Sequence, residues 1–256
     1  IWIGTDNGLY RYDGSEFTLF SLDGDEDATK YSINCIYLTS DEKLYVGTDN
    51  YGLYMYDNGT FQRVSEMYNL GVSTINAMYE DDNKNLWIAA SSGIFRLSSD
   101  GAEALADDVV SGLSVGNISG HGDYVYAIAN NDILITVDPE RHVSITNKSE
   151  YRVDDINSLY VDENGNRYYG SAGYSILKIG TDGKNEIINT GNLHGINKIY
   201  SDGDNIWALA DDGVGYITSK GNVTAIGGLS FNESMSDMII DFEGNYWFTS
   251  YRKGIL

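Results

Sequence analysis

The sequence repeats one short strand pattern seven times, and the spacing between repeats hardly changes. Each repeat opens with an aromatic residue, followed by an aliphatic residue, two small residues, a turn, a glycine and a second aliphatic residue. The opening residues are Trp2, Tyr45, Trp87, Tyr126, Tyr168, Trp207 and Trp247, which lie 39 to 43 residues apart. A fixed period near 40 residues is typical of a repeat architecture, so it restricts the folds open to this chain.

The third repeat shows the strand content most clearly. A first strand (a) is predicted at 75–79, a polar turn at 81–85, a second strand (b) at 86–90 and a third (c) at 94–97. A weaker fourth strand (d) follows in most repeats, as at 17–20. Four short strands in about 40 residues are typical of one blade of a β-propeller. No stretch of ten residues has the apolar spacing of a helix, so the chain is predicted to be all-β.

The two ends of the chain fix the number of blades. The first repeat begins at strand b and the last repeat stops at strand c. Since both contain strands b and c, they cannot be two halves of one blade. We therefore predict a β-propeller of seven four-stranded blades, with the first and last blades incomplete. The repeat is unbroken, so residues 1–256 are expected to form a single domain, and both ends are expected to continue into a longer protein.

Charge and cysteine content exclude several classes of partner. The formal net charge is −22, from 38 acidic and 16 basic residues. Nucleic acids and anionic membranes bind basic surfaces, so neither is an expected partner. The single cysteine, Cys35, excludes a disulfide framework within the chain. No motif predicts a metal site or a cofactor.

Three segments resemble the repeats of the two-component regulator propeller family. They are IWIGTDNGLYRYD (1–13), LYVGTDNYGLY (44–54) and IDFEGNYWFTS (240–250). The resemblance covers all seven repeats and is closest in the first three and the last. The fourth repeat departs most, because Asp132 replaces the turn glycine, and Ser175 does the same in the fifth.

The resemblance implies a sensor. Members of this family are the extracytoplasmic, periplasmic or cell-surface part of bacterial membrane receptors, and several recognise oligosaccharides. They often occur as paired propellers, with a histidine kinase or diguanylate cyclase output domain inside the cell. By resemblance, the expected partners are a small-molecule or oligosaccharide ligand, a second propeller and a membrane-linked output domain. A homodimer through the full-length receptor is left open. The sequence itself contains no kinase or cyclase motif.

Ligand-binding candidates come from the loops on one face. In a propeller the b-to-c and d-to-a connections share a face, on which tyrosine rings and polar groups would suit a polar ring-shaped ligand. The candidates are Tyr51, Tyr68, Tyr151, Arg152, Tyr174, His194, Tyr251, Arg252 and Lys253. The alternative is that exposed loop tyrosines reflect a chain with 21 tyrosines.

Two further patterns each allow two interpretations. The cations of 251–253 could hold a ligand carboxylate or neutralise nearby acidic groups. An Ile-Asn pair recurs at the start of strand a, at 33–34, 75–76, 156–157 and 196–197. These asparagines could bind a ligand, but the favoured interpretation is that each joins adjacent blades by hydrogen bonds to backbone.

An enzyme is the main alternative from another class. Propeller lyases and hydrolases need a base at the binding face, and of the three histidines only His194 is expected there. His121 and His142 belong to turns on the opposite face. The sequence therefore predicts a domain without catalysis that senses a ligand. The alternatives are a protein-docking or signal-transmitting propeller, and a lyase or hydrolase that uses His194.

Overall fold

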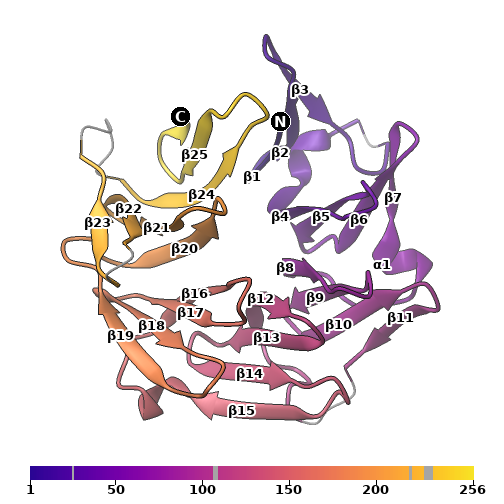
Figure 1. Ribbon diagram of the computed structural model, residues 1–256. Coiled ribbons are helices and arrows are strands. Elements are labelled where there is room, and N and C mark those ends of the chain that lie inside the picture. Colours follow the sequence, from indigo (N-terminus) through magenta and orange to yellow (C-terminus); the bar gives the residue numbers. More distant parts are fainter. Residues whose placement is uncertain (25, 106–108, 219–220, 228–232) are drawn as a thin grey trace. The chain divides into compact units, whose positions relative to one another are not determined.

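The computed structural model confirms an all-β, seven-bladed propeller (Figure 1). It describes residues 1–256 except 25, 106–108, 219–220 and 228–232. Each blade is an antiparallel sheet in which strands follow chain order, and the first and last blades have three strands. The described residues divide into two compact units, residues 1–130 with 136–143 and residues 131–135 with 144–256.

The strand bounds follow the predicted repeat. Blade 1 contains β1 (Trp2–Thr5), β2 (Gly8–Tyr12) and β3 (Phe17–Phe20). Blade 2 contains β4 (Ser32–Leu38), β5 (Leu44–Asp49), β6 (Leu53–Asp57) and β7 (Thr60–Arg63). Blade 3 contains β8 (Ile75–Glu80), β9 (Leu86–Ala90), β10 (Gly93–Ser98) and β11 (Gly101–Ala104). Blade 4 contains β12 (Val115–His121), β13 (Tyr124–Ala129), β14 (Ile133–Val137) and β15 (Val143–Asn147).

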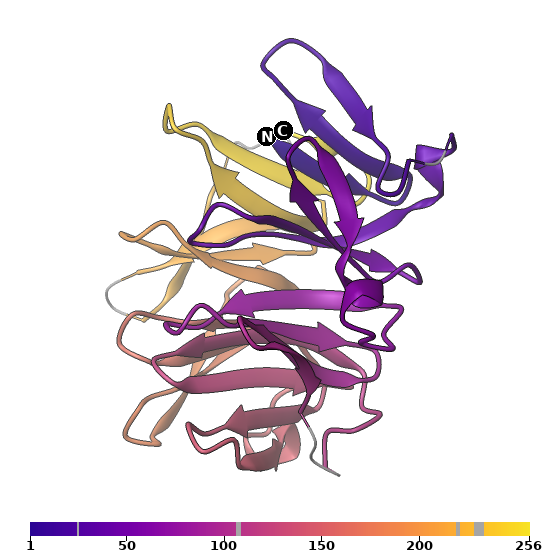
Figure 2. The same ribbon diagram turned by 90° about the vertical axis from the view of Figure 1, so that its right-hand side faces the viewer.

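The remaining blades have the same order. Blade 5 contains β16 (Ile156–Val161), β17 (Arg167–Ser171), β18 (Ser175–Ile179) and β19 (Asn185–Asn189). Blade 6 contains β20 (Ile196–Ser201), β21 (Ile206–Ala210), β22 (Gly213–Ile217) and β23 (Val223–Ala225). Blade 7 contains β24 (Met235–Ile240), β25 (Tyr246–Ser250) and β26 (Gly254–Ile255). The twist of the individual sheets is visible in Figure 2.

Inside each unit, neighbouring blades pack through their first strands. In the first unit β4 lies beside β8 and β8 beside β12, and in the second unit β16 lies beside β20 and β20 beside β24 (Figure 1). The small residues of strand b allow this approach. A Cβ on Gly47 would lie 2.7 Å from the side chain of Ile75, the first residue of the next blade. Ile75 itself is fully buried, so the glycine in the repeated pattern makes room for the core of the neighbouring blade.

A β-bulge recurs near the start of strand a. The ladder between β4 and β5 shifts register between Ile33 and Cys35, and that between β8 and β9 shifts between Ile75 and Ala77. The extra residue at each bulge is an asparagine, Asn34 or Asn76, which the ladder leaves unpaired. The repeated Ile-Asn pattern is thus the sequence signal of this bulge.

Short helical turns occupy three of the d-to-a connections. They are η1 (Ala28–Lys30), α1 (Val64–Met67) and η2 (Lys148–Glu150). Asp27 and Asn147 begin the two 3₁₀ turns by accepting hydrogen bonds from Thr29 N and Ser149 N. None of these turns was predicted, because four residues or fewer are too short for an apolar helical period.

Candidate functional site

In the first unit the predicted loop tyrosine Tyr51 packs on the protein itself, whereas Tyr68 is exposed. Tyr51, in the loop between β5 and β6, is partly buried, and its ring meets that of Tyr31 edge-on at 4.9 Å. Its carbonyl accepts a hydrogen bond of 2.8 Å from Arg63 Nε. Burial raises the pKa of Tyr31, so this phenol stays neutral. Tyr68 ends α1 and is 42% exposed, which leaves it accessible to a ligand.

In the second unit, Tyr174 and His194 come together. Tyr174 lies between β17 and β18, and His194 lies between β19 and β20. Their rings meet edge-on at 4.9 Å. Tyr174 is 54% exposed, and the side chain of His194 is 46% exposed. The two connections that the sequence placed on one face therefore meet within this unit and present an aromatic pair to solvent.

Asp211 and Asp212, between β21 and β22, hold His194. Asp211 Oδ2 lies 3.6 Å from His194 Nδ1, and Asp212 Oδ1 accepts a hydrogen bond of 3.0 Å from the backbone N–H of His194. The other carboxylate oxygen of Asp211 accepts hydrogen bonds from Asn197 Nδ2 (2.9 Å) and Ser234 Oγ (3.0 Å). The Tyr174–His194 site consists of Tyr174, His194, Asp211, Asp212 and Ser234.

The loop of residues 251–253 is tied to this site through its backbone. Tyr251 N donates to the carbonyl of Ser234 at 3.3 Å. Lys253 Nζ lies 3.2 Å from Glu233 Oε1, so this cation makes an ion pair within the chain. Arg252 is exposed and its guanidinium donates to no described residue. The ring of Tyr251 is 75% exposed. Of the two cations, only Lys253 makes an ion pair with a described residue.

Tyr151 and Arg152 stand apart from the Tyr174–His194 site. Tyr151 ends η2, and its N–H donates to the carbonyl of Lys148. Arg152 is exposed and adopts a left-handed backbone conformation (φ 57°). In the described part of the chain, neither side chain contacts Tyr174 or His194 by a hydrogen bond, an ion pair or a ring contact.

Three of the four recurring asparagines join adjacent blades, as the favoured interpretation predicted. Asn34 Nδ2 donates to the carbonyl of Ile75 at 3.1 Å, and Asn76 Nδ2 donates to the carbonyl of Val115 at 2.7 Å. In the second unit, Asn197 Nδ2 donates to the carbonyl of Met235 at 3.2 Å. Each amide of these three therefore bonds to the first residue of the next strand a.

The sequence did not predict the part played by Asp211 and Asp212. They occupy the loop positions that Ser91 and Ser92 fill in the third repeat, and two adjacent acids there were the available signal.

A second unpredicted group is Asp138, Glu140 and His142, whose ligand atoms lie within 4.8 Å of one another in the turn after β14. Both groups are exposed in part.

Among the described residues, no helix is long and apolar enough to cross a bilayer.

Comparisons with known proteins agree on the fold. Residues 69–92 match the two component regulator propeller family, which confirms the resemblance for the third repeat. A search of curated proteins found no match.

Solved structures with the same fold come from several classes of protein. The chain resembles the extracellular domain of a putative hybrid two component system from B. thetaiotaomicron (16% identity, TM-score 0.81), covering 99% of this chain and 36% of that one. It also resembles virginiamycin B lyase from Staphylococcus aureus (14% identity, TM-score 0.73; 97% and 86% covered). A third is PorZ, a surface component of the type-IX secretion system of Porphyromonas gingivalis (16%, 0.73; 96% and 42%). This chain thus spans about a third of the first of these proteins.

Proposed function

We propose that this chain, which carries a two-component regulator propeller repeat at residues 69–92, is a ligand-sensing domain of a bacterial membrane signalling receptor. In this proposal it is one propeller domain of a longer receptor, and it lies in the periplasm or at the cell surface. Its ligand is an oligosaccharide or another small polar molecule, and it performs no catalysis. A membrane-linked output domain, a second propeller and a homodimer belong to the same proposal.

The observation that carries the proposal is the Tyr174–His194 site. Two half-exposed rings stand edge-on at 4.9 Å, and the carboxylates of Asp211 and Asp212 lie beside them. Aromatic faces cover the apolar side of a sugar ring, while imidazole and carboxylate groups bond to its hydroxyls. Such an arrangement binds a neutral polar ligand without needing a nucleophile. The extracellular domain of the hybrid two component system with the same fold supports the placement outside the cytoplasm.

The test is thermal unfolding of the whole chain against a panel of neutral oligosaccharides, organic acids and peptides. A ligand at a hundred times its dissociation constant adds about 2.7 kcal/mol to the stability of the folded state. We expect one class of ligand to raise the midpoint, and Tyr174→Ala or His194→Ala to remove the shift. Tyr124→Ala, which changes an exposed tyrosine of the first unit that is not a ligand-binding candidate, is the matched control. The same shift in Tyr174→Ala would disprove the site.

A docking or signal-transmitting propeller is the first alternative. This alternative predicts that the chain unfolds cooperatively and that no small ligand changes the midpoint of its thermal unfolding.

A lyase or hydrolase is the second alternative, and one observation favours it. His194 lies 3.6 Å from a carboxylate oxygen, and a lyase has the same fold. Turnover of any panel compound that His194→Ala abolishes would establish catalysis. Ligand binding without turnover would support the sensor and argue against the enzyme.

A further inference from the structure

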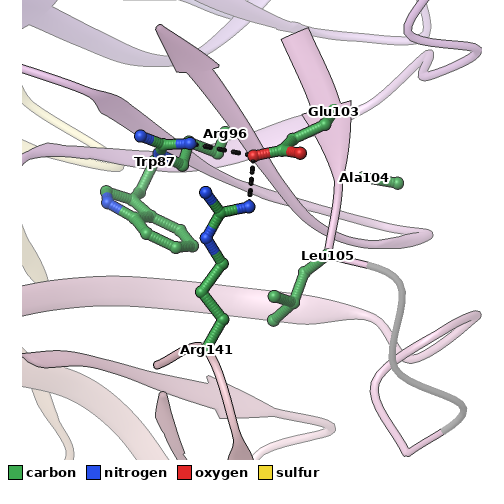
Figure 3. Close-up of a pocket in the computed structure, with 6 residues that line it drawn as sticks. All are labelled: Trp87, Arg96, Glu103, Ala104, Leu105 and Arg141. Carbon is green, nitrogen blue, oxygen red and sulfur yellow. Dashed lines mark hydrogen bonds and ion pairs between the residues drawn. The ribbon is translucent and has the colours of Figure 1, made fainter. Parts of the chain in front are cut away.

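A small pocket lies at the outer part of blade 3 in the first unit. It is lined by Trp87, Arg96, Glu103, Ala104, Leu105 and Arg141 and has a volume of about 190 Å³ (Figure 3). The ladders of the sheet place Arg96 opposite both Trp87 and Glu103, so three neighbouring strands bring these side chains into one row. Arg141 reaches in from the turn after β14.

The pocket is lined by two arginines in a strongly acidic protein. Arg96 Nη1 and Arg141 Nη1 both bond to Glu103 Oε1, at 2.9 Å and 2.7 Å. Two guanidinium groups and one carboxylate line the pocket, and the buried carboxylate of Asp81 is bonded to the Trp87 indole. The whole chain has a net charge of −22. Arginines placed in this way attract a small anion, although the chain as a whole repels one.

Two of the lining side chains are fixed in place. The buried indole of Trp87 donates from Nε1 to Asp81 Oδ2 at 2.8 Å. Arg96 Nη2 donates to Asn85 Oδ1 at 2.9 Å, while its Nη1 is held by Glu103. These contacts fix the positions of both groups, so a ligand would bind to a preformed surface.

Arg141 has donors left over. Its guanidinium makes one hydrogen bond to a described residue, through Nη1, and no described residue accepts from Nε or Nη2. These two N–H groups form the planar fork of the guanidinium, which matches the two oxygens of a carboxylate. Figure 3 shows the Arg141 side chain rising between Trp87 and Leu105 toward Glu103. A carboxylate on this fork would therefore stand next to apolar surface.

The backbone of Arg141 also departs from the rest of the repeat. In blades 5 and 6 the turn between the third and fourth strands has the same hydrogen-bond pattern, with Gly183 and Gly221 (both φ 78°) at this position. Arg141 takes a left-handed conformation there (φ 68°), which glycine adopts more easily. Glu42 and Lys84 tolerate such a conformation in other turns. What distinguishes Arg141 is that its side chain reaches the pocket.

We propose that this pocket binds a small organic acid, a carboxylate attached to a single apolar ring. The carboxylate pairs with the Nε and Nη2 groups of Arg141, and the ring lies beside Trp87. The volume of the pocket limits the ligand to a small molecule, because sites for drug-sized ligands have about 300–1,000 Å³ and this pocket is smaller. This site is independent of the Tyr174–His194 site and uses other residues.

The test is a titration of the whole chain with benzoate, followed by calorimetry and by ligand-observed NMR. Benzamide, which has the same ring and no charge, is the matched ligand. Because charge-assisted hydrogen bonds are about twice as strong as neutral ones, we expect benzoate to bind at least about tenfold more tightly. Arg141→Gly should weaken benzoate about tenfold while giving the turn the residue that blades 5 and 6 have.

Two further variants keep the test decisive. Lys84→Gly makes the same backbone change in a turn that does not line the pocket, so benzoate binding should not change. Glu103→Gln removes the carboxylate that competes for both arginines, so binding should tighten about threefold. Equal affinities for benzoate and benzamide would overturn the proposal. Absence of saturable benzoate binding, or unchanged binding in Arg141→Gly, would overturn it as well.

Discussion

Blades 1 and 3 begin with the same cross-strand pair and surround it differently. Trp2 stands opposite Arg11 in blade 1, as Trp87 stands opposite Arg96 in blade 3. Around Trp2, the rings of Phe20, Tyr56 and Phe61 lie with centroids 4.7 to 6.0 Å away, and the guanidinium of Arg11 lies 5.8 Å from the Trp2 ring. Around Trp87 the neighbours are charged, and they leave a pocket.

The difference shows how one repeat supports two uses. The backbone register fixes the tryptophan and the arginine, and the outer strand together with residues of the next blade then fills the remaining space. In blade 3, Leu105 bonds through its N–H to Ile94, at the ladder position where Phe20 faces Leu9 in blade 1. A smaller side chain at this position leaves room beside the tryptophan. Packing in blade 1 therefore contributes stability, while blade 3 keeps a polar opening.

The largest expected effect comes from the aspartate that anchors Trp87. Asp81 is buried, and its carboxylate accepts hydrogen bonds from Asn85 N, Asn85 Nδ2 and Trp87 Nε1. Asp81→Ala leaves these donors unpaired, so we expect a loss of about 3 kcal/mol in the free energy of unfolding. Asp13→Ala, in an exposed turn of blade 1, should lower the free energy of unfolding by much less. Urea unfolding of both variants measures the difference, and equal losses would contradict the assigned role of Asp81.

The two tryptophans should respond differently to the same change. Trp87→Phe removes the indole donor to the buried Asp81 carboxylate and should cost about 2 kcal/mol. The indole N–H of Trp2 donates to no described residue, and a phenylalanine keeps most of its aromatic contacts. Trp2→Phe should therefore cost less than about 1 kcal/mol. The free energies of unfolding in urea test this order, and a larger loss for Trp2→Phe would reverse the comparison.

Acid should act on blade 1 through Asp13. Hydrogen bonds from the backbone N–H groups of Glu16 and Ser15, with one from the Ser15 hydroxyl, lower the pKa of Asp13 from 3.8 to about 2. A lowered pKa in the folded state stabilises the fold above pH 3.8, and this contribution is lost as the pH falls through about 2. Asp13→Asn should thus lose less stability over this range than the wild type. Melting temperatures of both proteins, measured from pH 5 downward, test this prediction. If the melting temperatures of the variant and the wild type fall in parallel, the prediction is contradicted.

The fold could be predicted because its causes repeat along the chain. An opening aromatic residue, a small residue such as Gly47 and the Ile-Asn pair recur in most blades, and each has one structural role. The asparagines show the limit of this argument in blade 4, where Gly116 takes the bulge position and has no side-chain donor. There Asn131, from a different loop, donates to the carbonyl of Ile156.

The sites were less predictable because they combine residues from different repeats. The sequence placed Tyr174 and His194 in loops of one face, but the contribution of Asp211 depends on how loops of successive blades meet. The pocket of blade 3 was missed for the same reason, since Arg141 belongs to the next repeat. One signal was available, because arginine occupies a turn position that is glycine in blades 5 and 6.

The smallest expected effect separates the backbone of Arg141 from its side chain. Arg141→Gly relieves the left-handed conformation but increases the freedom of the unfolded chain, and these two effects nearly cancel. The variant also loses a partly exposed ion pair with Glu103, which contributes about 0 to 1 kcal/mol. Lys84→Gly changes the backbone in the same way without losing a described ion pair. Arg141→Gly should therefore be less stable than Lys84→Gly by less than about 1 kcal/mol in urea unfolding. A larger difference would mean that Arg141 stabilises the protein, and its position in the pocket would then need no ligand to explain it.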